Sequence, residues 1–342
     1  MEIQTIPHTT HDIRRHVDQS SCKRNGDYIA FLEGVNDSSD LEKHEEEQLE
    51  FGLGYDCPLF DRLYDFARIV VGSSVSAAKL LVDGSASVAI NWCGGWHHAQ
   101  RDEAEGFCYV NDIVIAIHKL LKKFDQILYI DLDVHHGNGV ENAFSCTNKV
   151  FTLSLHKYEP GFYPGTGSIS DVGCGKGKYY TANVPLKDGI RDDLYFTVFD
   201  SVSSKVFSAF RPKAVVVQCG ADCLSKDPLG TFNLTPRGLG RCVQRVLSWG
   251  LPTLFLGGGG YNFANTARCW TYLTSVIVGW EIPPDIPDHM CFLKYGPDFE
   301  LHIVPGNRTD CNTKEYIDSI VEIIATVLWT TRRLRASPHP CS

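Results

Sequence analysis

The segment YIDLDVHHGNG, residues 129 to 139, runs from apolar residues directly into ionisable ones. Side chains alternate along an extended chain, so Asp131, Asp133 and His135 point to the same side. Burying carboxylates without a cation is very costly. Asp222, in VVVQCGADCLSKDPLG, follows another apolar run. Asp133, His135 and Asp222 together predict an Asp-His-Asp site with an open position for zinc or a similar divalent ion, including ferrous iron.

Two adjacent histidines follow a third apolar run, in INWCGGWHHAQRDEAEGF. Taken alone, His97 and His98 are as consistent with ordinary loop structure as with a site, because they lack the helical spacing of a zinc protease motif. Beside a metal-activated water, they would supply a general base and a general acid near neutral pH. Each ring would need an acceptor at its far nitrogen, and Asp131 and Asn138 could provide these.

Four glycines at 257 to 260 precede Tyr261. They match neither a phosphate-binding loop nor a dinucleotide-binding turn, so nucleotide binding is not favoured. Glycine instead allows the backbone to approach a ligand closely. The Tyr261 hydroxyl could donate to a developing oxyanion beside the metal, and a core tyrosine bonded to the backbone is the alternative.

A parallel sheet would bring these segments together. Short runs that are apolar on both faces predict strands covered by helices on each side, at residues 87–92, 126–133, 150–156, 214–220 and 253–258. Helical patterns lie at about 60–82, 112–124, 192–210, 236–249, 263–278 and 313–333. Ligands bind at the carboxyl ends of such strands. Because no linker divides the pattern, we expect one α/β domain with a mostly parallel central sheet flanked by helices.

Composition narrows the class of function. The chain has 342 residues, with 32 basic against 41 acidic side chains and a net charge of −9, which argues against direct nucleic-acid binding and favours a cationic partner. No segment reads as a signal peptide or a membrane span. Thirteen cysteines without paired CxxC spacing indicate a reduced, intracellular protein. The acidic segment 34–50 is expected to be a surface loop or an exposed helix.

Five segments in order resemble the class I zinc-dependent histone deacetylases, from about residue 50 to the last helix: INWCGGWHHAQRDEAEGFCYVND, DLDVHHGNGVENAF, SLHKYEPGFYPGTG, GADCLSKDPLG and LGGGGYNFANTARCW. The resemblance implies the arginase/deacetylase fold and hydrolysis of N6-acetyl-lysine to lysine and acetate. It implies acetylated histones and other proteins as substrates, corepressors as possible partners, and action in the nucleus and cytoplasm in chromatin regulation and transcriptional repression. Neither nucleic acid nor membrane is an expected partner.

The resemblance also implies roles for individual residues. Asp133, His135 and Asp222 would bind zinc, His97 and His98 would be the acid/base pair, and Tyr261 would polarise the acetyl carbonyl. The lysine tunnel would be lined by Gly106, Phe107, Tyr163 and Leu229, with Asp56 at its rim. Structural or regulatory potassium ions would be held at two places, one formed by Asp131, Asp133, His135, Ser154 and Leu155 and the other by Phe144, Thr147, Val150 and Tyr180.

Three departures from that family pattern are visible. The family's N-terminal strand and helix have no evident counterpart, so we expect a divergent segment at 1–50, a catalytic domain at 51–335 and a short tail at 336–342. Asn138 stands where class I enzymes usually carry an aspartate, which makes a charged His98 less favoured. Tyr163 and Leu229 replace a phenylalanine and a methionine typical of the branch that the chain resembles.

Three other functions stay open on the sequence alone. The chain could deacetylate small acetylated amines such as polyamines. An arginase-like hydrolase would need a second metal, whose extra carboxylates are not evident. A catalytically impaired acetyl-lysine-binding scaffold would keep the fold without turnover, although every residue assigned to the chemistry is present.

Overall fold

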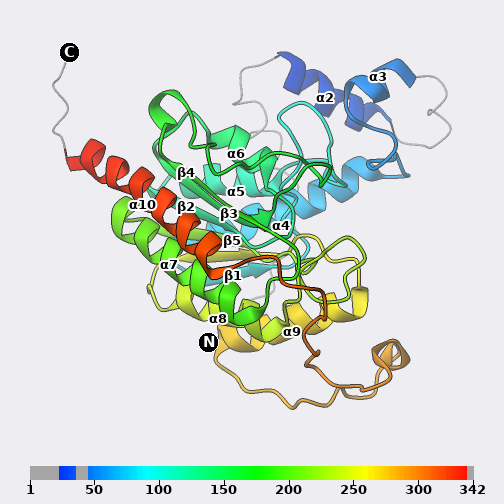
Figure 1. Ribbon diagram of the computed structural model, residues 1–342. Coiled ribbons are helices and arrows are strands. Elements are labelled where there is room, and N and C mark those ends of the chain that lie inside the picture. Colours follow the sequence, from blue (N-terminus) through cyan, green and yellow to red (C-terminus); the bar gives the residue numbers. More distant parts are fainter. Residues whose placement is uncertain (1–22, 36–44, 337–342) are drawn as a thin grey trace.

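Six parallel strands form the centre of the protein in the computed structural model, which describes residues 23–35 and 45–336 (Figure 1). The strands lie in the order β1-β6-β5-β2-β3-β4. Their bounds are Val88–Asn91 for β1, Ile127–Asp131 for β2, Val150–Lys157 for β3, Thr181–Leu186 for β4, Ala214–Gln218 for β5 and Thr253–Leu256 for β6. The expected parallel α/β fold is confirmed.

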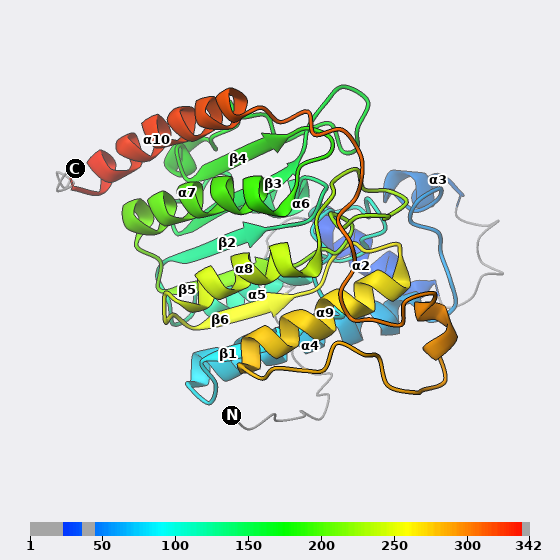
Figure 2. The same cartoon turned by 60° about the horizontal axis from the view of Figure 1, so that its bottom comes forward.

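Helices cover both faces of this sheet. Figure 2 shows one layer in front of the strands, which consists of α7 (Asp192–Phe210), α8 (Pro236–Leu247), α9 (Phe263–Val278) and α10 (Lys314–Ala336). The opposite layer contains α4 (Leu63–Asp83), α5 (Asp112–Leu120) and α6 (Asn138–Phe144). Short 3-10 helices lie at Gly175–Gly177 and Phe292–Tyr295. Among the described residues, no helix combines the length and the apolar character that crossing a membrane would require.

Strand β2 shows why the strands had to be apolar throughout. Leu128 and Ile130 are buried in the core beneath α7 to α10, whereas Ile127 and Tyr129 are buried in the core beneath α4 and α5. Each residue of the strand therefore meets a helix layer, and a polar side chain is excluded until the strand ends. Asp131 is the last residue of β2, at the edge where the loops begin.

The loops after β2 and β5 open the crevice that holds the site. Strand β2 is followed in the chain by β3 on one side, and β5 is followed by β6 on the other. The two loops therefore leave the sheet in opposite directions, which is the topological position at which open parallel sheets bind ligands. Asp133 and His135 lie in the first loop and Asp222 lies in the second.

The described part of the N-terminal segment packs onto the domain. Tyr28 and Leu32 of α2 (Lys23–Gly34) are buried with Phe51 and Leu53 in a third core. The Tyr28 hydroxyl donates to the Tyr109 carbonyl at 2.7 Å. Helix α3 (Glu45–Glu50) has no buried residue, which agrees with the expected exposed segment. Residues 1–22, 36–44 and 337–342, which include most of the predicted tail, lie outside the described residues.

The predicted strands and helices match the structure to within a few residues. Strand β4, and helices α2 and α6, were not predicted. Strand β4 has the sequence TANVPL, in which Asn183 and Pro185 interrupt the apolar pattern. It is an edge strand of the sheet that the described residues form, and proline is tolerated in such a strand because one of its sides pairs with no other strand there.

Asp112, at the start of α5, anchors the loop that carries the two histidines. Asn111 caps this helix by accepting from the Val114 amide. The buried Asp112 carboxylate accepts from the amides of Gly95 and Trp96, at 3.1 and 2.9 Å, and from the Ser74 hydroxyl. The backbone just before His97 is thereby attached to α4 and α5.

We expect Asp112→Ala to lower the free energy of unfolding by about 3 kcal/mol, because it leaves two buried amides and a hydroxyl without their acceptor. Urea denaturation measures the change. Asp125→Ala removes an exposed carboxylate after the same helix and should leave the midpoint unchanged. Equal midpoints for the two variants would contradict the anchoring role.

Candidate active site

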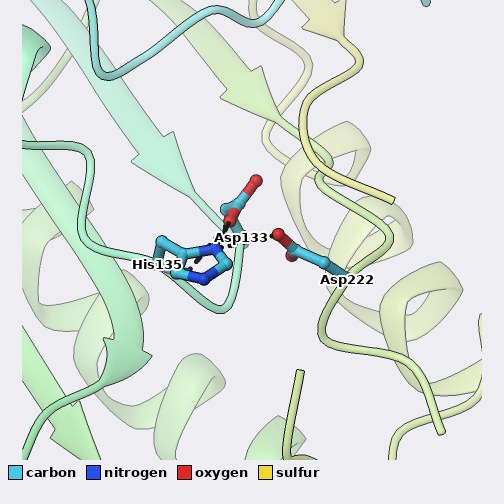
Figure 3. Close-up of side chains that lie close together, drawn as sticks. All are labelled: Asp133, His135 and Asp222. Atoms are coloured by element: carbon cyan, nitrogen blue, oxygen red, sulfur yellow. Dashed lines mark hydrogen bonds and ion pairs between the residues drawn. The ribbon is translucent and has the colours of Figure 1, made fainter. Parts of the chain in front are cut away.

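Three buried side chains meet at the carboxyl ends of β2 and β5 (Figure 3). His135 Nδ1 lies 3.2 Å from Asp133 Oδ1 and 3.0 Å from Asp222 Oδ2. One donor atom from each of the three residues lies within 4.8 Å of the others. The structure therefore brings together the Asp-His-Asp set that the sequence predicted.

The surrounding chain holds both carboxylates in place. Asp133 Oδ2 accepts from Gln218 Nε2 at 2.8 Å and from the Gly259 amide at 2.9 Å. Asp222 Oδ1 accepts from the Val134 amide at 3.0 Å. A Cβ on Gly220 would collide with the Asp133 carboxylate, so this close approach of backbone requires glycine.

The donor set fits a divalent cation. Asp133 and Asp222 are buried, and no lysine or arginine is paired with either one among the described residues. Burial and the charge of Asp133 raise the pKa of Asp222 in the metal-free chain. Burial opposes charge on His135, yet the two carboxylates raise the pKa of its ring to about 10. Both shifts reflect buried negative charge that a cation would balance, and two oxygens and one nitrogen suit zinc or ferrous iron.

His97 is paired with the fully buried Asp131. Its Nδ1 donates to Asp131 Oδ2 at 2.8 Å, and the Tyr129 hydroxyl donates to the same oxygen at 2.6 Å. His97 Nε2 lies 3.8 Å from Asp133 Oδ2. Burial opposes a charged ring, but Asp131 and Asp133 outweigh it and raise the pKa of His97 to about 9.

His98 has a different environment. Its Nδ1 lies 2.8 Å from Asn138 Oδ1, so its partner is a neutral amide. Burial and the neighbouring His97 ring, 4.0 Å away between centroids, hold the pKa of His98 well below its usual value. The two adjacent rings are therefore shifted in opposite directions, which is the arrangement expected of an acid/base pair.

A cavity of about 310 Å³ reaches the site at His135, one of the three candidate ligands. Three residues of the proposed chemistry line it: His98, His135 and Tyr261. The five predicted tunnel and rim residues also line it: Asp56, Gly106, Phe107, Tyr163 and Leu229. Phe162, which was not predicted, completes the lining. Phe107, Tyr163 and Leu229 keep 48%, 39% and 43% of their surfaces exposed, as residues at a tunnel mouth should. His97 is not among the lining residues and lies behind His98.

The backbone at Gly106 forms part of the cavity wall. Gly106 and Phe107 have φ values of +56° and +66°, and a Cβ on Gly106 would collide with the His98 ring and the Tyr163 hydroxyl. The Gly106 amide donates to Asp56 Oδ2 at 3.0 Å. Asp56 is exposed at the rim, so its carboxylate both closes this turn and faces the mouth of the cavity.

The predicted potassium positions lie along β2 and β3. Asp131 and Ser154 are opposite each other at the ends of these strands, and Leu155 follows. For the second position, the Thr147 amide donates to the Phe144 carbonyl at 3.1 Å just before Val150 begins β3, and the Tyr180 carbonyl accepts from Thr152. No observation tests either ion, so both stay predictions.

Several residues that support the site were not predicted from the sequence. Tyr129 and Gln218 bond the buried carboxylates, and Phe162 stacks on the His135 ring at 5.2 Å with an interplanar angle of 3°. Gln218 carried a signal, because it is a polar residue at the end of the apolar run AVVVQ. Gln100 and Glu105 approach the His98 side of the site and carried no such signal.

Comparison with known proteins agrees with this geometry. The sequence profile of the histone deacetylase domain matches residues 12–277. The chain belongs to the histone deacetylase family. It is 53% identical over 297 residues to histone deacetylase 8 of Xenopus laevis, covering 87% of this chain and 91% of that protein. It is 51% identical to histone deacetylase 8 of Danio rerio, over 87% of this chain and 78% of that protein. It is 49% identical to histone deacetylase 1 of Homo sapiens, over 92% of this chain and 63% of that protein.

This histone deacetylase is a hydrolase of the metal-dependent lysine deacetylase class, and its relatives are class I enzymes. The profile begins at residue 12, so the similarity starts before residue 50, where the resemblance was expected to begin.

We expect Asp133→Asn to lose bound metal and activity together, since an amide supplies no charge to balance the cation. Elemental analysis of the purified chain should find about one metal ion in the wild type and a small fraction of that in the variant. Asp125→Asn changes an exposed aspartate and should retain the metal. Full metal content in Asp133→Asn would remove this residue from the ligand set.

Proposed function

We propose that this histone deacetylase hydrolyses N6-acetyl-lysine in proteins, releasing acetate and lysine, with Asp133, His135 and Asp222 as its metal ligands. The observation that carries the proposal is the cavity that reaches the candidate ligand His135. Its wall is largely apolar, and His98, His135 and Tyr261 lie among its lining residues. Such a cavity suits a neutral acyl-lysine side chain, whose alkyl stem needs no polar partner.

The walls and the rim would position the substrate. Phe107, Phe162 and Tyr163 would pack along the methylene stem, and Leu229 would complete the mouth. Asp56 would accept hydrogen bonds from the backbone amides that flank the acetylated lysine, which fixes the depth of insertion. Because the product is a charged ammonium, the apolar wall would favour its release.

The chemistry would be divided among three side chains. A bound zinc or ferrous ion supplies Lewis acidity toward the acetyl carbonyl and toward water. His98, whose Nδ1 is held by Asn138, would accept a proton from the attacking water at Nε2 and then deliver one to the leaving amine. His97, held by Asp131, would contribute a positive ring behind His98.

Tyr261 would donate its hydroxyl to the oxygen of the tetrahedral intermediate. Burial and the nearby carboxylates Asp222 and Asp133 raise the pKa of this hydroxyl well above its ordinary value, so it keeps its proton and acts as a donor. The Tyr261 amide donates to Asp227 Oδ2 at 2.8 Å, which fixes the backbone from which the ring projects.

Substrates, location and partners follow from the family and the charge. Acetylated histone tails and other acetyl-lysine proteins are the proposed substrates, and a net charge of −9 suits basic tails. The proposed role is chromatin regulation and transcriptional repression in the nucleus and cytoplasm, with corepressor proteins as partners. Potassium at the two predicted positions along β3 would stabilise the loop that carries Asp133 and His135.

The arginase-like alternative lacks support. Among the described residues, Asp133, His135 and Asp222 form the one cluster suited to a metal, and no second carboxylate pair adjoins it. The scaffold alternative predicts binding of an acetyl-lysine peptide without turnover, and the polyamine alternative predicts a preference for small acetylated amines.

The first test is acetate release from an acetyl-lysine peptide by the purified chain, with metal content measured on the same sample. Turnover that is lost with a chelator and restored by zinc or ferrous ion supports the proposal. Metal-loaded, folded protein that binds the peptide and releases no acetate would favour a scaffold, and faster turnover of acetylated polyamines would favour a small-amine deacetylase.

We expect Tyr261→Phe to keep its metal and to lower kcat about 100-fold or more, because it removes one donor to the developing oxyanion. Tyr158→Phe removes an exposed hydroxyl and is the control. Peptide affinity should change little in either variant. A kcat close to that of the wild type would withdraw the role of Tyr261.

A further inference from the structure

Glu105 lies next to the site, and the proposed chemistry assigns no role to its carboxylate. Its Oε1 accepts from Asn138 Nδ2 at 2.7 Å and from the Tyr163 hydroxyl at 2.9 Å. Its Oε2 accepts from Gln100 Nε2 at 2.7 Å. Three side chains therefore converge on one carboxylate, and one of them, Asn138, is the partner of His98.

We propose that Glu105 is a positioning residue that sets the proton arrangement of His98 through Asn138. The inference rests on the proposed deacetylase function, in which His98 moves protons at Nε2. It explains how Asn138, which is neutral and stands where class I enzymes usually carry an aspartate, can serve beside His98.

Aspartate and asparagine differ in what they can offer a histidine ring. An aspartate only accepts hydrogen bonds, so it always draws the N–H of a histidine toward itself. An asparagine can present either its oxygen or its NH₂ group. If Asn138 turned its NH₂ group toward His98, Nδ1 would have to accept, the proton would move to Nε2, and the ring would no longer be a base toward the cavity.

Glu105 removes this ambiguity. An ionised carboxylate accepts hydrogen bonds and donates none, so it must face the NH₂ group of Asn138. The amide oxygen is then directed at His98 Nδ1, which must carry the proton, and Nε2 keeps its lone pair. Glu105 thus orients His98 through two hydrogen bonds, one of 2.7 Å from Asn138 to Glu105 and one of 2.8 Å between Asn138 and His98.

The other contacts of Glu105 hold the carboxylate in this position. Gln100 Nε2 also donates to the His98 carbonyl at 3.0 Å, and Gln100 Oε1 accepts from Asn142 at 3.0 Å. Burial and Glu105 raise the pKa of Tyr163, so its hydroxyl stays protonated and donates. The Tyr163 ring meets the His98 ring edge to face at 4.9 Å. Glu105 therefore connects the proposed base to a residue of the cavity wall.

The decisive experiment exchanges the two side chains. Glu105→Gln alone leaves Asn138 free to turn, and we expect kcat to fall about tenfold or more. Asn138→Asp alone places two carboxylates at the distance of a 2.7 Å hydrogen bond, where they repel each other. We expect the kcat of this variant also to fall about tenfold. The E105Q/N138D double variant restores one amide and one acceptor-only carboxylate, now against His98. Its kcat should return to within about threefold of the wild type.

Glu103→Gln is the matched control, since it removes one charge from an exposed side chain in the same loop and should alter kcat by less than about twofold. Metal content and melting temperature are measured on every variant. A general structural role for Glu105 predicts that the double variant is at least as impaired as the worse single variant. That result, or unchanged kcat in Glu105→Gln, would overturn the proposal.

A second readout does not depend on turnover. Nitrogen-15 spectra of histidine-labelled, metal-loaded protein report which ring nitrogen carries the proton, and the His98 signals are assigned by their absence in His98→Gln. We expect protonated Nδ1 in the wild type and the double variant, and a mixed or reversed tautomer in Glu105→Gln. If the His98 tautomer is unchanged in Glu105→Gln, Glu105 does not orient His98 through Asn138. A wild type that releases no acetate would sink the proposed function while leaving this spectral test intact.

Discussion

Two carboxylates that share one buried space are the constraint on which the site depends. Asp133 and Asp222 come from different strands and are held beside the same imidazole nitrogen. Such a group is unfavourable in a protein interior unless a cation completes it. The hydrogen bonds from Gln218 and from backbone amides stabilise this negative charge only in part. The loops after β2 and β5 and the hydrogen bonds around them therefore fix the positions of both carboxylates.

The parallel sheet makes this arrangement possible because each strand has apolar core residues along its length and polar site residues only after its end. Leu128 and Ile130 face one helix layer while Ile127 and Tyr129 face the other, and polar residues follow only where the strand ends. Since β2 and β5 lie side by side at the topological switch point, their loops bring charged groups together without burying them inside the helix layers. The histidine loop after β1 is attached separately, through Asp112.

Much of the fold and part of the site could be predicted from the sequence, for a physical reason. Strands that are apolar on both faces are recognisable, and residues directly after them are placed by the direction of the sheet. Asp133, His135 and Asp222 belong to this group. Strand β4 was missed because Asn183 and Pro185 break its pattern, which a strand at the end of the sheet tolerates. Glu105 was missed because it reaches Asn138 across a turn with positive φ at Gly106 and Phe107, and such turns have no periodic signal.

The two histidines differ in how far the nearest carboxylate in their hydrogen-bond chains lies from the ring. His97 rests on Asp131, a fully buried group that also accepts from Tyr129 and is enclosed by the sheet. His98 rests on a neutral amide, and the nearest carboxylate in that chain of hydrogen bonds is one step further out, where it also accepts from Tyr163 in the cavity wall. A ligand that displaces Tyr163 would therefore disturb the hydrogen bonds that orient His98, whereas His97 is insulated from the cavity. Under the proposed mechanism, Glu105 therefore couples the position of Tyr163, which contacts the substrate, to the orientation of His98, which acts as the base.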